Sequence, residues 1–166
     1  MVINRQATLI KTIQDSMHEM AIAFFATDIG IRDGPALVNH AADGVSHPAN
    51  RADVTAIVGF RGQMTGGVHL SAPMHAALGL ASAFWGEPLE SFNETGRDAF
   101  GELANILAGA LKSRIDDGLD LTPPRIVQGS DPADLPTYGG SYSARCYFMT
   151  VNGPLYVEVF HDGQET

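Results

Sequence analysis

Apolar and polar residues alternate along the chain with two different periods, which predict helices in some segments and strands in others. Residues 8–26 follow the helical period, and their predicted apolar face consists of Leu9, Ile13, Met17, Met20 and Phe24. Residues 27–52 carry several glycines and prolines, and they predict loops around one short strand near residues 36–40.

Two β-hairpins are predicted from segments rich in β-branched and apolar residues. The first joins residues 54–60 to residues 64–71 through a turn at residues 61–63, with Gly66–Gly67 marking a bend or bulge. The second lies near the end of the chain, where two strand-like segments, residues 142–150 and 155–161, flank an Asn152–Gly153 turn.

Two more helices and a short strand are predicted between the hairpins. A proline opens the first helix and a glycine ends it, over residues 73–86, and Ser71 offers a cap. The second helix is capped by Asn93 or Thr95 and runs to about Asp116. A short strand at residues 125–128 and a polar loop at residues 129–140 follow.

The order of these elements predicts an α+β protein, in which amphipathic helices pack on a mostly antiparallel sheet. The length of 166 residues suits a single domain spanning residues 1–166. Each half begins with a long amphipathic helix and ends, or nearly ends, in a hairpin. This order hints at an internal two-fold repeat.

The composition excludes several classes of function. The chain has 10 Lys and Arg residues against 19 Asp and Glu residues, a net charge of −9, which argues against nucleic acid or an anionic membrane as a partner. Its apolar share of 45% argues against a disordered chain. A lone cysteine, Cys146, excludes an internal disulfide and favours a cytoplasmic protein. No apolar stretch reaches the roughly 18 residues that span a bilayer, and the first residues do not resemble a signal peptide.

The candidate functional residues lie in the segment Thr95–Asp116. On a helical wheel with about 100° per residue, Asp98, Glu102, Asn105 and Gly109 form one narrow stripe. The opposite, mostly apolar side is expected to pack on the sheet, and it holds Ala99, Phe100, Leu103, Ile106, Leu107, Ala110, Leu111 and Arg114.

Small residues flank this stripe, namely Gly101, Ala104, Ala108 and Gly109. A glycine inside an exposed helix costs about 1 kcal/mol relative to alanine, so two glycines imply a benefit, such as close approach by a large partner. An ordinary solvated helix face is the alternative interpretation of the spacing.

Glu102 and Asn105 do not form a self-contained active site. An asparagine amide does not titrate usefully, but it can hold a water molecule through its donor and acceptor groups. Positioning of that kind contributes much of the catalysis in phosphoryl transfer. A glutamate can pair with a lysine of a partner. The pair is therefore expected to act on a partner that supplies the metal ion and the phosphate.

Other candidate groups are weaker. None of the six histidines lies four residues from another, so no zinc-hydrolase motif is present. The Gly66–Gly67 pair lacks the lysine of a phosphate-binding loop. Cys146 alternates with apolar residues and is expected in the core.

The spacing Asp98-x3-Glu102-x2-Asn105, followed downstream by Pro124, resembles the signature of the CheC/CheX chemotaxis phosphatases, and CheX-type domains in particular. The first hairpin, the helix after it, the stretch GELANILAG and the segment TPPRIVQG also resemble that family, in the same order. The resemblance covers roughly residues 54–129.

The resemblance implies a fold of helices on an antiparallel sheet with internal pseudo-two-fold symmetry, and a homodimer. It also implies hydrolysis of the aspartyl phosphate on a CheY-like response regulator. Asn105 would orient the attacking water and Glu102 would pair with the regulator's lysine, while Asp98, Gly101 and Gly109 would contact the regulator. No cofactor is expected on this chain, because Mg²⁺ would be bound by the regulator.

The first helix departs from the family pattern, and two other classes of function are alternatives to the phosphatase. The first helix offers Asp15-x3-Glu19-x2-Ile22, and isoleucine cannot orient water, so one site per chain is expected. A non-catalytic module that binds a receiver domain, or that serves as a signalling adaptor, fits the same fold. A small-ligand sensor is a third class, but the sequence carries no pocket signature for it.

Overall fold

The computed structural model describes residues 5–24, 31–40, 52–129, 135–140 and 142–162. The helices in these ranges are α1 (Arg5–Phe24), α2 (Met74–Trp85) and α3 (Glu94–Ile115). The strands are β1 (Arg32–His40), β2 (Val54–Arg61), β3 (Gly66–Ala72), β4 (Asp120–Leu121), β5 (Arg125–Gln128), β6 (Tyr142–Thr150) and β7 (Gly153–His161).

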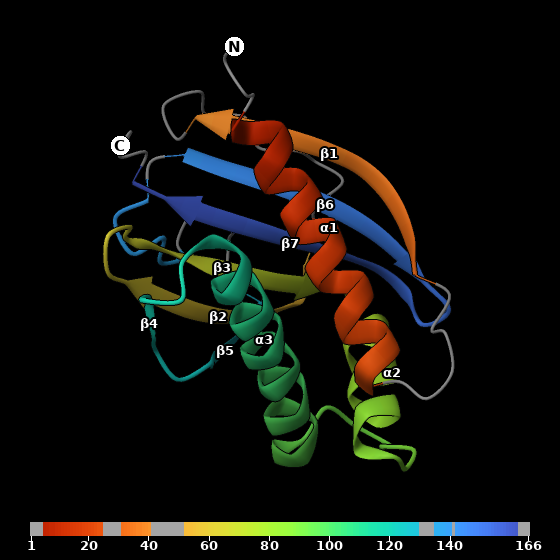
Figure 1. Ribbon diagram of the computed structural model, residues 1–166. Coiled ribbons are helices and arrows are strands. Elements are labelled where there is room, and N and C mark those ends of the chain that lie inside the picture. The colour runs from red at the N-terminus through yellow and green to blue at the C-terminus, as the bar shows by residue number, and fades with distance from the viewer. Residues whose placement is uncertain (1–4, 25–30, 41–51, 130–134, 141, 163–166) are drawn as a thin grey trace.

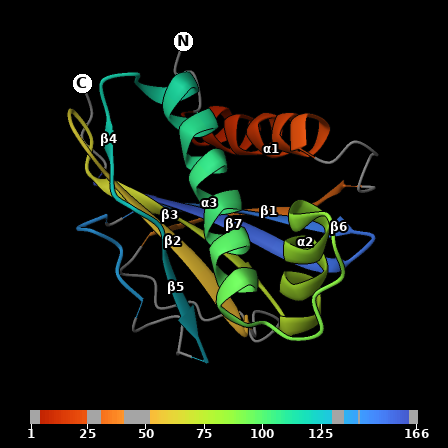
Figure 2. The ribbon, with the colours of Figure 1, turned by 90° about the horizontal axis from the view of Figure 1, so that it is seen from below.

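All of these strands belong to one antiparallel sheet, and the three helices cover one of its faces (Figure 1). The strands lie in the order β1, β6, β7, β3, β2, and the short strands β4 and β5 both pair with the outer edge of β2. The view from below shows the helices as a second layer, with α3 beside β5 (Figure 2). The predicted α+β class is confirmed.

The hydrophobic core lies between the sheet and the helices. Alternate residues of β2, namely Val54, Ala56 and Val58, face the helices and are fully buried. From the helix layer, Phe100 and Leu107 of α3 are fully buried against them. This packing fixes α3 firmly on the sheet, because each of these side chains loses its apolar surface to the core.

The predicted apolar face of α1 is confirmed where the structure describes it. Ile13, Met17 and Met20 are buried in the core, and Leu9 packs partly against it. The helix begins at Arg5, three residues earlier than predicted. The side chain of Phe24 and the last two predicted residues of the helix lie outside the described residues.

The bounds of several strands differ from the prediction, and β3, for example, begins at Gly66 rather than at residue 64. β1 begins at Arg32 rather than near Ala36, because pairing with β6 continues through a register irregularity between Asp33 and Ala36. β4 was not predicted, since two residues carry no alternation. In the last hairpin Thr150 pairs with Gly153, so the turn is one residue earlier than the predicted Asn152–Gly153.

The start of α2 corrects one further prediction. Ser71 does not cap the helix, because it lies in β3 with its Oγ 2.9 Å from Thr55 Oγ1. Instead, the Asp53 carboxylate accepts a 2.9 Å hydrogen bond from the Met74 N–H at the start of the helix. Gly86 ends α2 as predicted, with the left-handed φ of 89°.

Gly66 and Gly67 permit close approach of backbone and ring rather than a bulge. Both pair with β2 in unbroken register. A Cβ atom on Gly66 would lie 1.9 Å from the carbonyl oxygen of Phe160, and one on Gly67 would lie 3.0 Å from the ring of Tyr138. The predicted bend or bulge is therefore wrong. The two positions are glycine because neighbouring atoms leave too little room for a side chain.

The sheet face opposite the helices carries a buried polar layer. His69 Nε2 donates a 2.8 Å hydrogen bond to the Pro136 carbonyl, and burial lowers the pKa of His69 to about 4. Arg145 of β6 forms an ion pair with Glu158 of β7. The ring of Tyr138 lies over this face, against β2 and β3.

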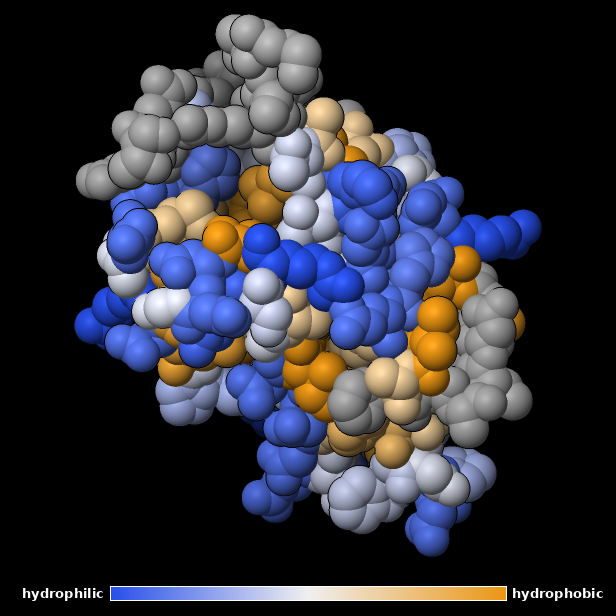
Figure 3. Space-filling model, viewed as in Figure 1, coloured by the Kyte–Doolittle hydropathy of each residue, from blue (hydrophilic) through white to orange (hydrophobic). Residues whose placement is uncertain are grey.

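The outer surface of the helix layer is mainly hydrophilic, with smaller apolar areas between the polar side chains (Figure 3). Among the described helices, none combines the length and apolar character needed to cross a membrane. The internal two-fold symmetry remains a prediction.

Candidate functional site

Helix α3 is well defined at its N-terminal end, where the candidate residues lie. The Asn93 side chain accepts a 3.0 Å hydrogen bond from the Gly96 N–H, which selects Asn93 rather than Thr95 as the cap. Glu94 in the first turn and Lys112 and Arg114 in the last turn have the signs that the helix dipole favours. The helix ends at Ile115, as predicted to within a residue.

The stripe predicted on the helical wheel faces outward. Asp98 and Glu102 are exposed, while Asn105 and Gly109 are half-buried. Within the described part of the chain, the side chains of Asp98, Glu102 and Asn105 make no hydrogen bond or ion pair. Their polar groups are therefore available to water or to another molecule.

The side of α3 away from the stripe holds these groups on a rigid support. Phe100, Leu103 and Leu107 are at most 1% exposed and pack in the core. Positions on a packed helix vary little, so the spacing between Glu102 and Asn105 is fixed before any partner arrives.

One flank of the stripe is covered by the chain itself, which differs from the expectation of an open flank. Ala104 and Ala108 are at most 3% exposed, and Gly101 is also buried. A Cβ atom on Gly101 would lie 3.5 Å from Ile126 Cδ1 and 3.6 Å from Pro124 Cβ. Packing against the sheet and its edge thus covers this flank, and a Cβ atom on Gly101 would meet its neighbours only at ordinary contact distance.

The other small residue, Gly109, is open. A Cβ atom at this position would meet nothing within 4 Å. Packing does not require a glycine there, and the helix loses stability by having one. Close approach by another molecule at Gly109, which lies on the same stripe as Asn105, remains a prediction.

The corresponding stripe on α1 is different. Asp15 forms a 2.8 Å ion pair with Lys11, and Glu19 forms one with Arg114 of α3. Ile22, in the place that Asn105 takes on α3, is 80% exposed and has no polar group. These carboxylates already have partners, whereas Glu102 has none among the residues that the structure describes.

Sequence reasoning did not single out Thr122, which lies beside the site. Its Oγ1 accepts a 2.8 Å hydrogen bond from the Gly59 N–H and lies 3.3 Å from the Pro123 carbonyl. The adjacent Pro124 contacts the Gly101 side of α3. A threonine between two short edge strands gives no distinct sequence signal, although the Thr-Pro-Pro segment indicates a turn.

The other titratable groups do not form a second site. Cys146 is buried in the core as predicted, and burial raises the pKa of its thiol to about 12. His69 is held neutral in the sheet. Throughout the described ranges, no three His, Cys, Asp or Glu side chains lie close enough to hold a metal ion together.

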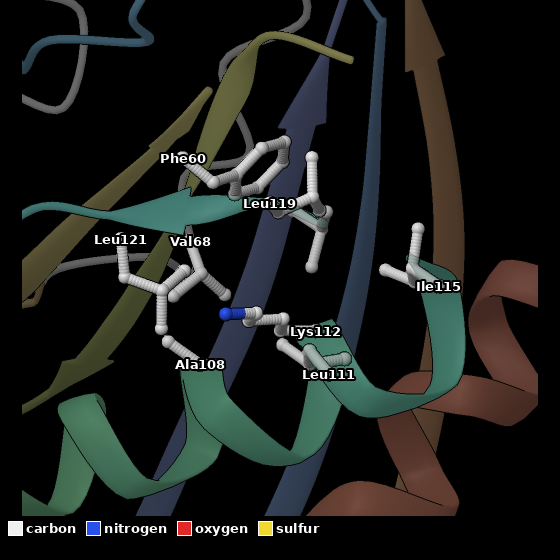
Figure 4. Close-up of a pocket in the computed structure, with 9 residues that line it drawn as sticks. Phe60, Val68, Ala108, Leu111, Lys112, Ile115, Leu119 and Leu121 are labelled. Atoms are coloured by element: carbon white, nitrogen blue, oxygen red, sulfur yellow. The ribbon is translucent and has the colours of Figure 1, made fainter. Parts of the chain in front are cut away.

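A small cavity lies beside the C-terminal half of α3 (Figure 4). It is lined by Phe60, Val68, Ala108, Leu111, Lys112, Ile115, Leu119, Leu121 and Val159. The volume is about 10 Å³, and the lining is apolar apart from the Lys112 ammonium group, so it does not suit a ligand. It is a packing defect rather than a binding site.

The arrangement can therefore position a water molecule and a cation, but it has no nucleophile with an adjacent base. Asn105 offers a donor and an acceptor, and Glu102 offers a carboxylate one turn away on the same face. Chemistry at this site requires a second molecule that brings the reacting group.

The chain is similar to a known protein family and to several solved structures. A family described as "Chemotaxis phosphatase CheX" matches residues 54–148. The chemotaxis protein CheX from Vibrio vulnificus has 17% identity and a TM-score of 0.75, covering 93% of this chain and 99% of that one. A CheC-like superfamily protein from Shewanella sp. PV-4 has 21% identity and a TM-score of 0.73, covering 93% and 97%.

A third similar structure is a complex of CheX with CheY, BeF3 and Mg²⁺ from Borrelia burgdorferi. Its identity is 18% and its TM-score is 0.70, and the match covers 92% of this chain and 97% of that one. No curated protein sequence matches the chain significantly. The fold is thus CheC-like, and because the family match spans more than half of its residues, the chain belongs to the chemotaxis phosphatase CheX family.

Proposed function

We propose that this protein hydrolyses the aspartyl phosphate of a CheY-like response regulator, with Asn105 and Glu102 as the groups that act. The observation that carries this proposal is the pair of polar side chains, without partners among the described residues, on the outward face of a rigidly packed helix. Membership of a phosphatase family and the CheX–CheY complex from Borrelia burgdorferi support it.

Asn105 acts on the water. Its amide oxygen accepts a hydrogen bond from the water and its NH₂ group donates one, so the water oxygen is directed at phosphorus. A new phosphorus–oxygen bond forms while the bond to the aspartyl oxygen breaks. The aspartate leaves as a carboxylate, and the proton of the water passes to the phosphate product or to solvent. Asn105 changes neither charge nor covalent state.

Glu102 acts on the partner. Its carboxylate pairs with the lysine at the receiver's phosphorylation site and fixes the docking register. Asp98 and Gly109 extend the contact along the stripe, and Gly101 contributes by allowing Pro124 to lie close to the helix. Mg²⁺ is held by the receiver, where it neutralises charge on the phosphoryl oxygens.

The net charge of −9 shapes this encounter. A receiver's metal-binding site is itself acidic, so long-range attraction does not bring the two proteins together. Affinity instead depends on the local pair formed by Glu102 and on close contact at Gly109. Apart from the effect of salt on the pair that Glu102 forms, the affinity of the complex should therefore depend only weakly on ionic strength.

The test is a dephosphorylation time course of a phosphorylated receiver with Mg²⁺ in excess. We expect the wild-type protein to accelerate loss of phosphate, and Asn105→Ala to abolish the acceleration while still binding the receiver. Glu102→Gln, which keeps the shape but loses the charge, should weaken binding as well. Glu87→Gln changes an exposed carboxylate in the α2–α3 loop and serves as the matched control.

The outcomes separate the two functions that fit the fold. Acceleration by wild type that Asn105→Ala removes and Glu87→Gln keeps supports the phosphatase. Receiver binding without any acceleration, for several receivers, contradicts it and indicates a docking module instead.

A further inference from the structure

The edge of the sheet beside α3 contains a one-residue insertion. In β4, Leu121 pairs with Phe60, whereas in β5, Arg125 pairs with Ile57. Three residues, 122–124, therefore stand opposite two residues of β2. This is the geometry of a β-bulge on an edge strand, a feature that often re-aims side chains next to functional sites.

The composition of the bulge suits this place. Pro123 and Pro124 have no N–H group, so neither can continue the ladder, and proline in a sheet is confined to edges and bulges. Both prolines are exposed on their outer side. The two residues thus form a surface segment of restricted backbone freedom.

Thr122 joins this segment to the sheet. Its N–H donates a 2.8 Å hydrogen bond to the Gly59 carbonyl, as in a regular ladder. The Gly59 N–H donates in return to the side-chain Oγ1 of Thr122, also at 2.8 Å. The same hydroxyl donates to the Pro123 carbonyl at 3.3 Å. One side chain thus links β2 to the middle of the bulge.

The far side of the bulge lies against the candidate site. Pro124 Cβ is 3.6 Å from the position of a Cβ atom on Gly101. Gly101 directly precedes Glu102 and lies one helical turn from Asn105. Pro124, which is exposed, consequently lies at the covered flank of the stripe, and Pro123 precedes it.

We propose that Thr122 is a positioning residue of the site, and that its hydroxyl holds the Pro123–Pro124 segment as one wall of the surface on which the receiver docks. This rests on the proposed function. A wall contributes by fixing the register of the partner, so its displacement affects binding more than the chemical step at Asn105.

The test uses Thr122→Val, which keeps the β-branched shape and removes the hydroxyl, and Thr122→Ser, which restores the hydroxyl. Amide hydrogen exchange is measured at Gly59 and Gly101, and steady-state kinetics are measured with a phosphorylated receiver and Mg²⁺. For Thr122→Val we expect exchange at Gly59 to rise about tenfold. We expect its KM to rise about fivefold with kcat within about twofold of wild type. Thr122→Ser should match wild type.

Each remaining result overturns the proposal in a distinguishable way. A folded Thr122→Val with unchanged KM, or a Thr122→Ser with the same defect as Thr122→Val, overturns the role of the hydroxyl while leaving the phosphatase intact. A large fall in kcat with unchanged KM overturns the docking wall. A wild-type protein that neither binds nor dephosphorylates receivers overturns the proposed function, and the docking role with it.

Discussion

Arg145 and Glu158 form a buried ion pair across β6 and β7, on the sheet face away from the helices. Arg145 Nε donates a 2.6 Å hydrogen bond to Glu158 Oε2, and the two side chains are only 12% and 5% exposed. Arg145 also donates to the Tyr147 hydroxyl at 3.2 Å and lies over the ring of Tyr156. Each charge is thus removed from water and depends on the other.

We expect Glu158→Ala to lower the free energy of unfolding by about 3 kcal/mol, because it leaves the Arg145 charge buried without its partner. Urea denaturation followed by circular dichroism measures the change. Lys11→Ala breaks an exposed pair with Asp15, in which the two side chains are 74% and 49% exposed, and should cost much less stability than Glu158→Ala. Equal losses in the two variants would contradict the distinction.

Stability should fall with acidification because of His69. Burial lowers its pKa from 6.5 to about 4 in the folded protein, so between these values the unfolded chain binds the proton and the folded chain does not. The free energy of unfolding therefore declines as the pH falls from 6.5 to about 4, by up to about 3 kcal/mol from this group. Two charged residues lie beside His69 across the sheet, Glu158 on β7 and Arg145 on β6, and they pair with each other.

His69→Gln tests this assignment, since glutamine keeps an N–H donor for the Pro136 carbonyl and does not titrate. Urea midpoints measured from pH 7.5 to pH 4 should fall more steeply for wild type than for the variant. Parallel curves for the two proteins would show that other groups carry the acid sensitivity.

The sequence predicts well those elements whose periodicity repeats several times. The helical repeat of α3 placed Asp98, Glu102 and Asn105 on one face, and the face is outward in the structure. The long strands β2 and β6 were predicted to within a residue for the same reason. β4 has only two residues and is defined by its pairing with β2, which no local pattern reveals.

The surroundings of the site could not be predicted, because they depend on segments distant in sequence. Gly101 looks open on a helical wheel, yet Pro124 and Ile126 fold back along β2 and cover it. Thr122 acquires its role only through Gly59 on the neighbouring strand. A helical wheel carries no information about what packs beside the helix, so it marked four small residues as open where only Gly109 is open.

The cavity beside α3 should accept one more methyl group (Figure 4). Val68→Ile adds a methyl to a lining residue that is already buried, and we expect it to raise the free energy of unfolding by up to about 1 kcal/mol. Val58→Ile is the matched control, because Val58 is equally buried but does not line the cavity, and overpacking should destabilise it. Thermal unfolding of both variants provides the comparison, and a loss of stability in Val68→Ile would contradict the defect.

Substitutions at Gly101 and Gly109 of α3 should separate effects on helix stability from effects on receiver docking. Alanine at Gly109 meets nothing within 4 Å, and alanine at Gly101 meets Ile126 and Pro124 only at ordinary contact distance, so each substitution should stabilise the helix by about 1 kcal/mol. Because Gly109 is open and alanine at Gly101 leaves Pro124 in place, we expect Gly109→Ala to weaken receiver binding more than Gly101→Ala does. Titration of a BeF3-activated receiver measures both. A larger loss of binding for Gly101→Ala than for Gly109→Ala would contradict close approach of the receiver at Gly109.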